Sequence, residues 1–202
     1  MKYEYFAILD TETNSLINQS IPESGLPVQV SMIITNLDMI PIKSINVYVK
    51  QRYMDPGSVA IHGLSSEILE QYGALEPQEA WDMIFNDDIE WDKVVGIAHN
   101  SSFDSKVLDR FSEQCGRYNP LLKYFDTLAF FRKNKDKNRK NNKLETITEY
   151  LGGDSEKIEK LSELIYKGST GYHDARFDTA ALLYVVNTVK NDFIKFYSNQ
   201  LY

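Results

Sequence analysis

The sequence is poor in cysteine and has no long apolar run. Cys115 is the single cysteine among 202 residues, which excludes an internal disulfide framework and suits the reducing conditions of the cytoplasm. No apolar run approaches the roughly 20 residues of a membrane-spanning helix. The first residues, MKYEYFAILDTET, also lack the apolar stretch of a signal peptide. We therefore expect a cytoplasmic protein with no membrane association.

Basic residues are also scarce. The chain has 22 Lys and Arg against 29 Asp and Glu, which gives a net charge of −7. Strong non-specific binding to a nucleic-acid duplex depends on Lys and Arg that neutralise phosphates, so this balance argues against it. It does not exclude nucleic acid as a substrate, because a site rich in carboxylates is itself negative until metal ions fill it.

The apolar pattern predicts a single α/β domain, residues 1–202, with a mixed sheet. A buried strand is expected to end at Asp10, and two strands joined by a short turn follow, which favours antiparallel pairing. Helices and strands then alternate up to a last helix that starts near Asp174 and ends near residue 190. The expected strands are 3–10, 28–37, 44–50, 93–100 and the start of 121–131, and the expected helices are 65–73, 77–89, 101–114, the end of 121–131, 143–151 and 155–167, the last of these ended by Gly168.

Four acidic residues lie where core-facing side chains are expected. Asp10 and Glu12 are two apart, so they project from one face of their strand. Asp104 and Asp178 fall on the apolar stripes of two helices, although the second helix is apolar almost all round. A buried carboxylate is costly unless it is paired or binds a metal, so we expect the four to converge around Mg²⁺ or Mn²⁺ rather than to act as separate caps. The apolar residues at helical spacing are Val107, Leu108 and Phe111 for Asp104, and Ala181, Leu182 and Val185 for Asp178.

His173 stands five residues before Asp178 in the segment HDARFD. Residues five apart lie about 140° apart around a regular helix, so the two side chains cannot share one face of it. The spacing therefore predicts that a helix begins between them and that His173 occupies the loop before it. This arrangement fits a mobile base beside a metal ligand that is fixed on the helix.

Three short segments together resemble the DEDDh 3′–5′ exonucleases, the family of the proofreading epsilon subunit of bacterial DNA polymerase III. They are LDTETNSL, AHNSSFD and HDARFD, the last with an H-x-A-x-x-D pattern. The segments IHGLS, DTLAF and KLETITEYLG resemble lesser landmarks of the family, in the usual order from about residue 3 to 190. The resemblance implies an RNase H-like fold, a five-stranded mixed sheet flanked by helices. It also implies hydrolysis of nucleic acid from the 3′ end to 5′-mononucleotides.

The resemblance also implies roles for individual residues. Asp10, Glu12 and Asp178 would hold one divalent ion, while Asp10 and Asp104 would help to hold a second, partly through water. His173 would be the general base that takes a proton from the attacking water. The cofactor would be two Mg²⁺ or Mn²⁺ ions. The residues implied to bind the substrate are Thr13, Leu16, Ile61, His62, Asn100 and Phe103.

Some of these assignments have simpler alternatives. Leu16 would act as a wedge against the last base, but ordinary packing explains Leu16 and Ile61 equally well. The first motif usually continues TTGL in the family, whereas this chain has TNSL, so Asn14 and Ser15 put the loop near the substrate in question. The stretch 152–171 is also long, with an added charged helix before His173. These departures affect substrate preference rather than catalysis.

Residues 132–143, RKNKDKNRKNNK, carry seven basic residues and one acid. In an acidic protein this is a conspicuous local patch. One interpretation is a solvated, disordered loop. The other is a loop that follows the phosphates of a bound strand beside the cleft.

The leading functional prediction is a metal-dependent 3′–5′ exonuclease that acts on nucleic acid with a free 3′ end, with DNA favoured over RNA. A DNA polymerase is a candidate partner. The alternatives are an exoribonuclease of the same family, a degenerate module that binds nucleic acid or a polymerase, and a structural cation-binding domain. The full set of four acids counts against the degenerate module, and a purely structural domain leaves His173 unexplained.

Overall fold

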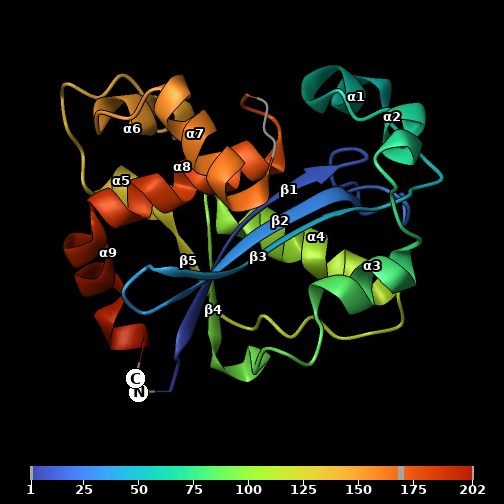
Figure 1. The fold of residues 1–202 in the computed structure, drawn as a ribbon, viewed down its shortest axis with the longest axis horizontal. Coiled ribbons are helices and arrows are strands. Elements are labelled where there is room, and N and C mark those ends of the chain that lie inside the picture. Colours follow the sequence, from blue (N-terminus) through green and yellow to red (C-terminus); the bar gives the residue numbers. More distant parts are fainter. Residues whose placement is uncertain (1, 168–170, 202) are drawn as a thin grey trace.

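A five-stranded sheet crosses the middle of the molecule, with strand order β3-β2-β1-β4-β5 (Figure 1). The computed structural model describes residues 2–167 and 171–201. β1 pairs antiparallel with β2 and β2 antiparallel with β3, whereas β1 with β4 and β4 with β5 are parallel. The predicted α/β fold with a mixed sheet is therefore confirmed. The strands are β1 (Tyr5–Thr13), β2 (Pro27–Asn36), β3 (Pro41–Tyr48), β4 (Val94–Ala98) and β5 (Tyr124–Asp126).

Helices cover both faces of this sheet. One face carries α5, α6, α8 and α9, with α7 packed on α8 and β3; the other carries α3 and α4, while α1 and α2 lie beyond one end (Figure 1). The described helices are α1 (Pro56–His62), α2 (Ser66–Gln71), α3 (Pro77–Ile84), α4 (Ser101–Gln114), α5 (Thr127–Lys133), α6 (Leu144–Tyr150), α7 (Ser155–Tyr166), α8 (Ala175–Thr188) and α9 (Lys190–Tyr197), with short 3₁₀ turns at Trp91–Lys93 and Ser198–Gln200.

The alternation of side chains along β1 decides which face each residue serves. Phe6 and Ile8 are buried in the core beneath α8 and α9, while Ala7 and Leu9 are buried in the core against α3 and α4. Because successive side chains of a strand point to opposite faces, the next even-numbered residues belong to the α8 face. The side chains of Asp10 and Glu12 therefore point toward α8.

β1 is longer than the sequence predicted. It continues to Thr13 instead of ending at Asp10, because Asp10 pairs with Ser31 and Glu12 with Gln29 of the neighbouring β2. On its other side β1 pairs with β4 only from Tyr5 to Ile8. The two acids therefore lie in a part of β1 that has a partner strand on one side only.

Two helices escaped the sequence prediction. α1 begins after Asp55, whose carboxylate accepts a hydrogen bond from the backbone N–H of Ser58, and it ends at Gly63 with a left-handed φ of 74°. α9 follows α8 directly, since α8 ends at Thr188 rather than near residue 190. α7 ends at Tyr166, and the predicted stop at Gly168 lies outside the described residues.

None of the helices in residues 2–167 and 171–201 combines the length and the apolar character needed to span a bilayer.

Candidate functional site

The two helical acids are buried, as the sequence predicted. Asp104 is 3% exposed and Asp178 is 9% exposed. Asp178 lies in the first turn of α8, which packs on β1 and β2, so it meets the face that carries Asp10 and Glu12. The structure thus brings together three of the four predicted carboxylates from two elements, β1 and α8.

Asp104 reaches the group from the opposite side of the sheet. It lies in the first turn of α4, and its Oδ1 accepts a hydrogen bond of 2.9 Å from Thr11 Oγ1. This approach is possible because β4 ends before the level of Thr11 and leaves that edge of β1 uncovered. The turn into α4 is made by Asn100, which has a left-handed φ of 75° and donates its N–H to Asp126 Oδ1 at 3.0 Å.

Burial disfavours the charged form of all four acids, and repulsion from neighbouring carboxylates adds to it: from other members of the group for Asp10 and Glu12, from Asp126 for Asp104, and from Asp174 and Glu145 for Asp178. Burial, the largest cause in each case, raises the pKa of Glu12 to about 9 and the pKa values of Asp104 and Asp178 to about 7. Burial and then the charge of Asp178 raise the pKa of Asp10 well above its ordinary value. Bound cations would reverse this effect, and oxygen donors of this kind suit hard ions such as Mg²⁺ and Mn²⁺. The donor set therefore fits a divalent metal centre.

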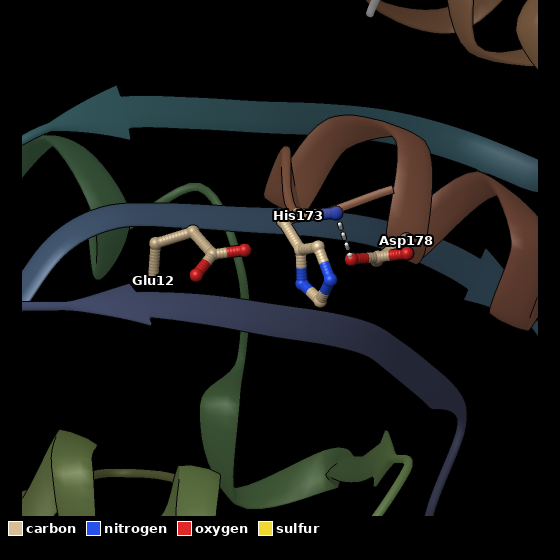
Figure 2. Close-up of side chains that lie close together, drawn as sticks. All are labelled: Glu12, His173 and Asp178. Carbon is tan, nitrogen blue, oxygen red and sulfur yellow. Dashed lines mark hydrogen bonds between the residues drawn. The ribbon is translucent and has the colours of Figure 1, made fainter. Parts of the chain in front are cut away.

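His173 completes the group from the loop before α8 (Figure 2). One ligand atom from each of Glu12, His173 and Asp178 lies within 4.8 Å of the other two. The residue has a left-handed φ of 70°, and its backbone N–H donates to Asp178 Oδ2 at 3.0 Å. The predicted loop position of His173 is confirmed. The backbone contact places His173 beside Asp178, while its imidazole is exposed. Its role as a mobile base stays a prediction.

The start of α8 is fastened to β2 by a residue that the sequence analysis missed. Gln29 is 1% exposed. Its Nε2 donates to Asp174 Oδ1 at 3.1 Å and to Asn46 Oδ1 at 2.9 Å, and its Oε1 accepts the N–H of Ala175 at 3.2 Å. Arg176 pairs with the same Asp174. A lone amide inside the apolar strand VQVSMII was the available signal, because a buried polar side chain needs partners.

The predicted substrate-binding residues near the end of β1 differ in their exposure to solvent and in the hydrogen bonds that their side chains form. Leu16 is 79% and Ile61 is 62% exposed. His62 is engaged at both ring nitrogens: Nδ1 accepts the N–H of Leu64 at 3.0 Å, so Nε2 carries the proton and donates to the carbonyl oxygen of Thr13 at 3.1 Å. Burial lowers the pKa of His62. This histidine ties α1 to the end of β1 and thereby presents Ile61.

In the segment TNSL, where this chain departs from the family pattern, Asn14 is a buried residue that holds the following loop by hydrogen bonds. Asn14 is 0% exposed, and its Nδ2 donates to the carbonyl oxygens of Glu23 and Tyr53 at 2.6 and 2.9 Å. Its Oδ1 accepts the N–H of Leu26 at 2.9 Å. Asn14 therefore holds the 14–26 loop from within, rather than changing the loop's exposed surface.

A cavity of about 540 Å³ opens beside the acids. Asp10, Asp178 and His173 form one part of its lining, and Arg132 and Lys143 belong to the same lining. The other predicted site residues do not line it, namely Glu12, Thr13, Leu16, Ile61, His62, Asn100, Phe103 and Asp104. Asn100 is exposed and Phe103 is half-buried at the start of α4. The cavity thus joins the metal-binding group to both ends of the basic segment 132–143.

Solved structures resemble this chain over nearly its whole length. Escherichia coli exonuclease I, in a zinc-bound complex with single-stranded DNA, has a TM-score of 0.69 at 18% identity and covers 98% of this chain. The nuclease domain of 3′hExo, a DEDDh family member bound to rAMP, has a TM-score of 0.64 at 15% identity and covers 94%. A 3′-exonuclease solved as a complex for recognition of the histone mRNA stem-loop has a TM-score of 0.66 at 15% identity and covers 95%.

These likenesses establish the fold. The chain has the RNase H-like fold of the DEDDh-type exonucleases, with the five-stranded sheet that the sequence predicted. It spans 43% of the exonuclease I chain but 93% of the 3′hExo nuclease domain and 84% of the histone mRNA exonuclease. No protein-family model and no curated protein matches the sequence. The specific resemblance to the polymerase III epsilon subunit stays a prediction.

The raised pKa values predict how the metal-free protein responds to pH. Glu12, Asp104 and Asp178 bind protons more tightly when folded than when unfolded, where their pKa values are near 4.5 and 3.8. The free energy of unfolding should therefore fall as pH rises from about 5 to about 9. At pH 8 the variant Asp104→Asn should be more stable than wild type by on the order of 4 kcal/mol, since the pKa of Asp104 rises from 3.8 to about 7 and each unit of pKa elevation costs about 1.4 kcal/mol.

Urea unfolding in EDTA at pH 6 and pH 8 measures this difference. Asp109→Asn is the matched control, because Asp109 is an exposed acid on the same helix. An equal loss of stability between the two pH values in wild type and Asp104→Asn would contradict the assignment of a raised pKa to Asp104.

Proposed function

We propose that the protein is a metal-dependent 3′–5′ exonuclease that hydrolyses terminal phosphodiesters of nucleic acid to 5′-mononucleotides. The observation that carries this proposal is the convergence of two half-buried carboxylates, Asp10 and Glu12, and two buried ones, Asp104 and Asp178, with His173 on an exonuclease fold. A structural ion site does not need a histidine held against two of its acids. DNA is the favoured substrate, and RNA is the alternative, since the solved relatives include one bound to single-stranded DNA and one that recognises an mRNA end.

The residues have distinct roles in this proposal. Asp10, Glu12 and Asp178 would hold one divalent ion, and Asp10 and Asp104 would help to hold the second, partly through water. When bound, two such ions stabilise the attacking and the leaving oxygen of an in-line displacement at phosphorus. The His173 imidazole takes the proton of the attacking water. Leu16 and Ile61, both exposed beside the end of β1, pack against the bases at the 3′ end.

The first test of the proposal removes one acid. Asp10→Ala should reduce cleavage of a 3′-labelled single-stranded oligonucleotide to background in Mg²⁺, because Asp10 serves both ions. The variant should remain folded, since its loss relieves repulsion within the group. Parallel reactions with DNA, RNA and mismatched duplex, each with and without Mg²⁺, identify the preferred substrate.

Asp87→Ala is the control for this experiment, because Asp87 is an exposed acid remote in sequence from the site segments. Wild-type turnover by Asp10→Ala in Mg²⁺ would show that the two-ion assignment is wrong. Tight binding of oligonucleotide by wild type, with no cleavage of any substrate, would instead favour the degenerate binding module.

The second test concerns His173. A general base takes the proton of the attacking water, so wild type should react faster than a variant without the base at pH values where little hydroxide is present. His173→Ala should lower kcat by on the order of 10²-fold or more. This deficit should shrink at high pH, where hydroxide replaces water as the nucleophile and needs no base to remove a proton.

The readout is a pair of pH–rate profiles at saturating Mg²⁺, together with Mg²⁺ affinity from calorimetry. The affinity is needed because His173 lies among the atoms that could hold an ion. A deficit that is constant over pH, with unchanged affinity, would mean that His173 positions the substrate. A large loss of affinity would make it a metal ligand instead.

A further inference from the structure

The basic segment 132–143 is a folded connection between α5 and α6. At its far end His99 Nε2 donates to the carbonyl oxygen of Asn142 at 2.8 Å, which ties the segment to the end of β4. Near its middle Tyr150 Oη donates to Asp136 Oδ2 at 2.6 Å, which ties it to α6. The interpretation of this segment as a disordered loop is therefore replaced by one in which tertiary contacts set its course.

Arg139 holds the segment in place through its own contacts, so its guanidinium is less available to a ligand than the neighbouring cations are. Its Nη2 donates to the carbonyl oxygens of Phe131 and Asn134 at 2.6 and 3.1 Å. Its guanidinium also lies over the rings of Phe131 and Tyr150, at 5.0 and 5.8 Å from their centroids. This cation folds the segment back on α5 and α6.

The remaining cations separate into two groups. Arg132, in the last turn of α5, and Lys143, just before α6, line the cavity that also contains Asp10, Asp178 and His173. Both are exposed, and within the described part of the chain neither forms an ion pair. The other basic residues of the segment, which do not line this cavity, are Lys133, Lys135, Lys137 and Lys140.

A cavity that holds both a metal-binding acid group and two cations suits a chain of phosphates. The acids and their ions would engage one phosphate, and the cations would engage a neighbouring one. Glu145 lines the same cavity, so its charge is not uniformly positive and a small free anion gains little there. A polyanion that spans acids and cations together matches the whole lining.

We propose that Arg132 and Lys143 form a phosphate subsite for the nucleic-acid strand on the 5′ side of the bond that is cleaved. The inference rests on the proposed function for the position of that bond. Leu16 and Ile61 would hold the terminal nucleotide beside α1, while the subsite lies between α5 and α6, on the other side of the view (Figure 1). The strand would then run from the subsite past the acids to the end of β1.

The test compares two double variants of equal charge change. Arg132→Gln with Lys143→Gln removes the subsite, and Lys135→Gln with Lys137→Gln is the control within the same segment. The substrates are a single-stranded ten-residue DNA and the p-nitrophenyl ester of thymidine 5′-monophosphate, which has one phosphodiester and no neighbouring phosphate. Both reactions are followed over a range of salt concentrations in Mg²⁺.

For the oligonucleotide the subsite variant should lose about tenfold or more in kcat/KM. The slope of log kcat/KM against log salt should flatten by about 0.7, since the subsite engages one phosphate and each phosphate contact on a single strand contributes about 0.7. Hydrolysis of the ester should be unchanged, and the control variant should stay near wild type in both reactions. An equal loss on ester and oligonucleotide, or an unchanged salt slope, would overturn the subsite.

A binding experiment separates failure of the subsite from failure of the proposed activity. Fluorescence anisotropy with labelled oligonucleotide and Mg²⁺ compares the double variants in the inactive Asp10→Ala background. Weaker binding by the subsite variant alone supports the subsite even if wild type hydrolyses nothing, which would refute the exonuclease. Equal binding by both double variants refutes the subsite even if wild type is an active nuclease.

Discussion

The main constraint on this structure is the free-energy penalty of holding four carboxylates close together and away from water. Desolvation and repulsion act in the same direction on Asp10, Glu12 and Asp178, so the cluster opposes folding at neutral pH until a cation enters. Two well-packed elements offset this penalty. β1 is hydrogen-bonded along its whole length to β2, and α8 is buried almost all round. An unfavourable group persists where the surrounding packing leaves it no alternative position.

The acids were predictable because each lies on an element whose periodicity shows its burial. A helical repeat of apolar residues placed Asp104 and Asp178 in the core, and a two-residue spacing placed Asp10 and Glu12 on one face. The awkward spacing between His173 and Asp178 was equally informative, since it required a helix start between them. In all these cases the information is local, within about two helical turns.

The features that the sequence analysis missed, other than α1, depend on contacts between segments far apart in the chain. Residues 10–13 are extended because β2 offers them partners, and nothing local distinguishes them from a loop. The contact of Gln29 with the start of α8 joins segments 145 residues apart. α1 was different, because Asp55, Pro56 and Gly63 are recognisable cap signals that the sequence analysis did not weigh. The likeness at 15–18% identity shows that this three-dimensional arrangement can persist when little sequence is shared.

Net charge alone does not decide whether this protein can bind nucleic acid. The value of −7 includes four carboxylates that bound ions would neutralise and that burial already disfavours as charged groups. It also averages over a folded segment in which Arg132 and Lys143 line the same cavity as the acids. Attraction at short range depends on which charges share a cavity, because charges more than about 8–10 Å apart at the surface are largely screened at physiological salt. An acidic protein can therefore bind a polyanion tightly at one place, provided that ions and cations meet there.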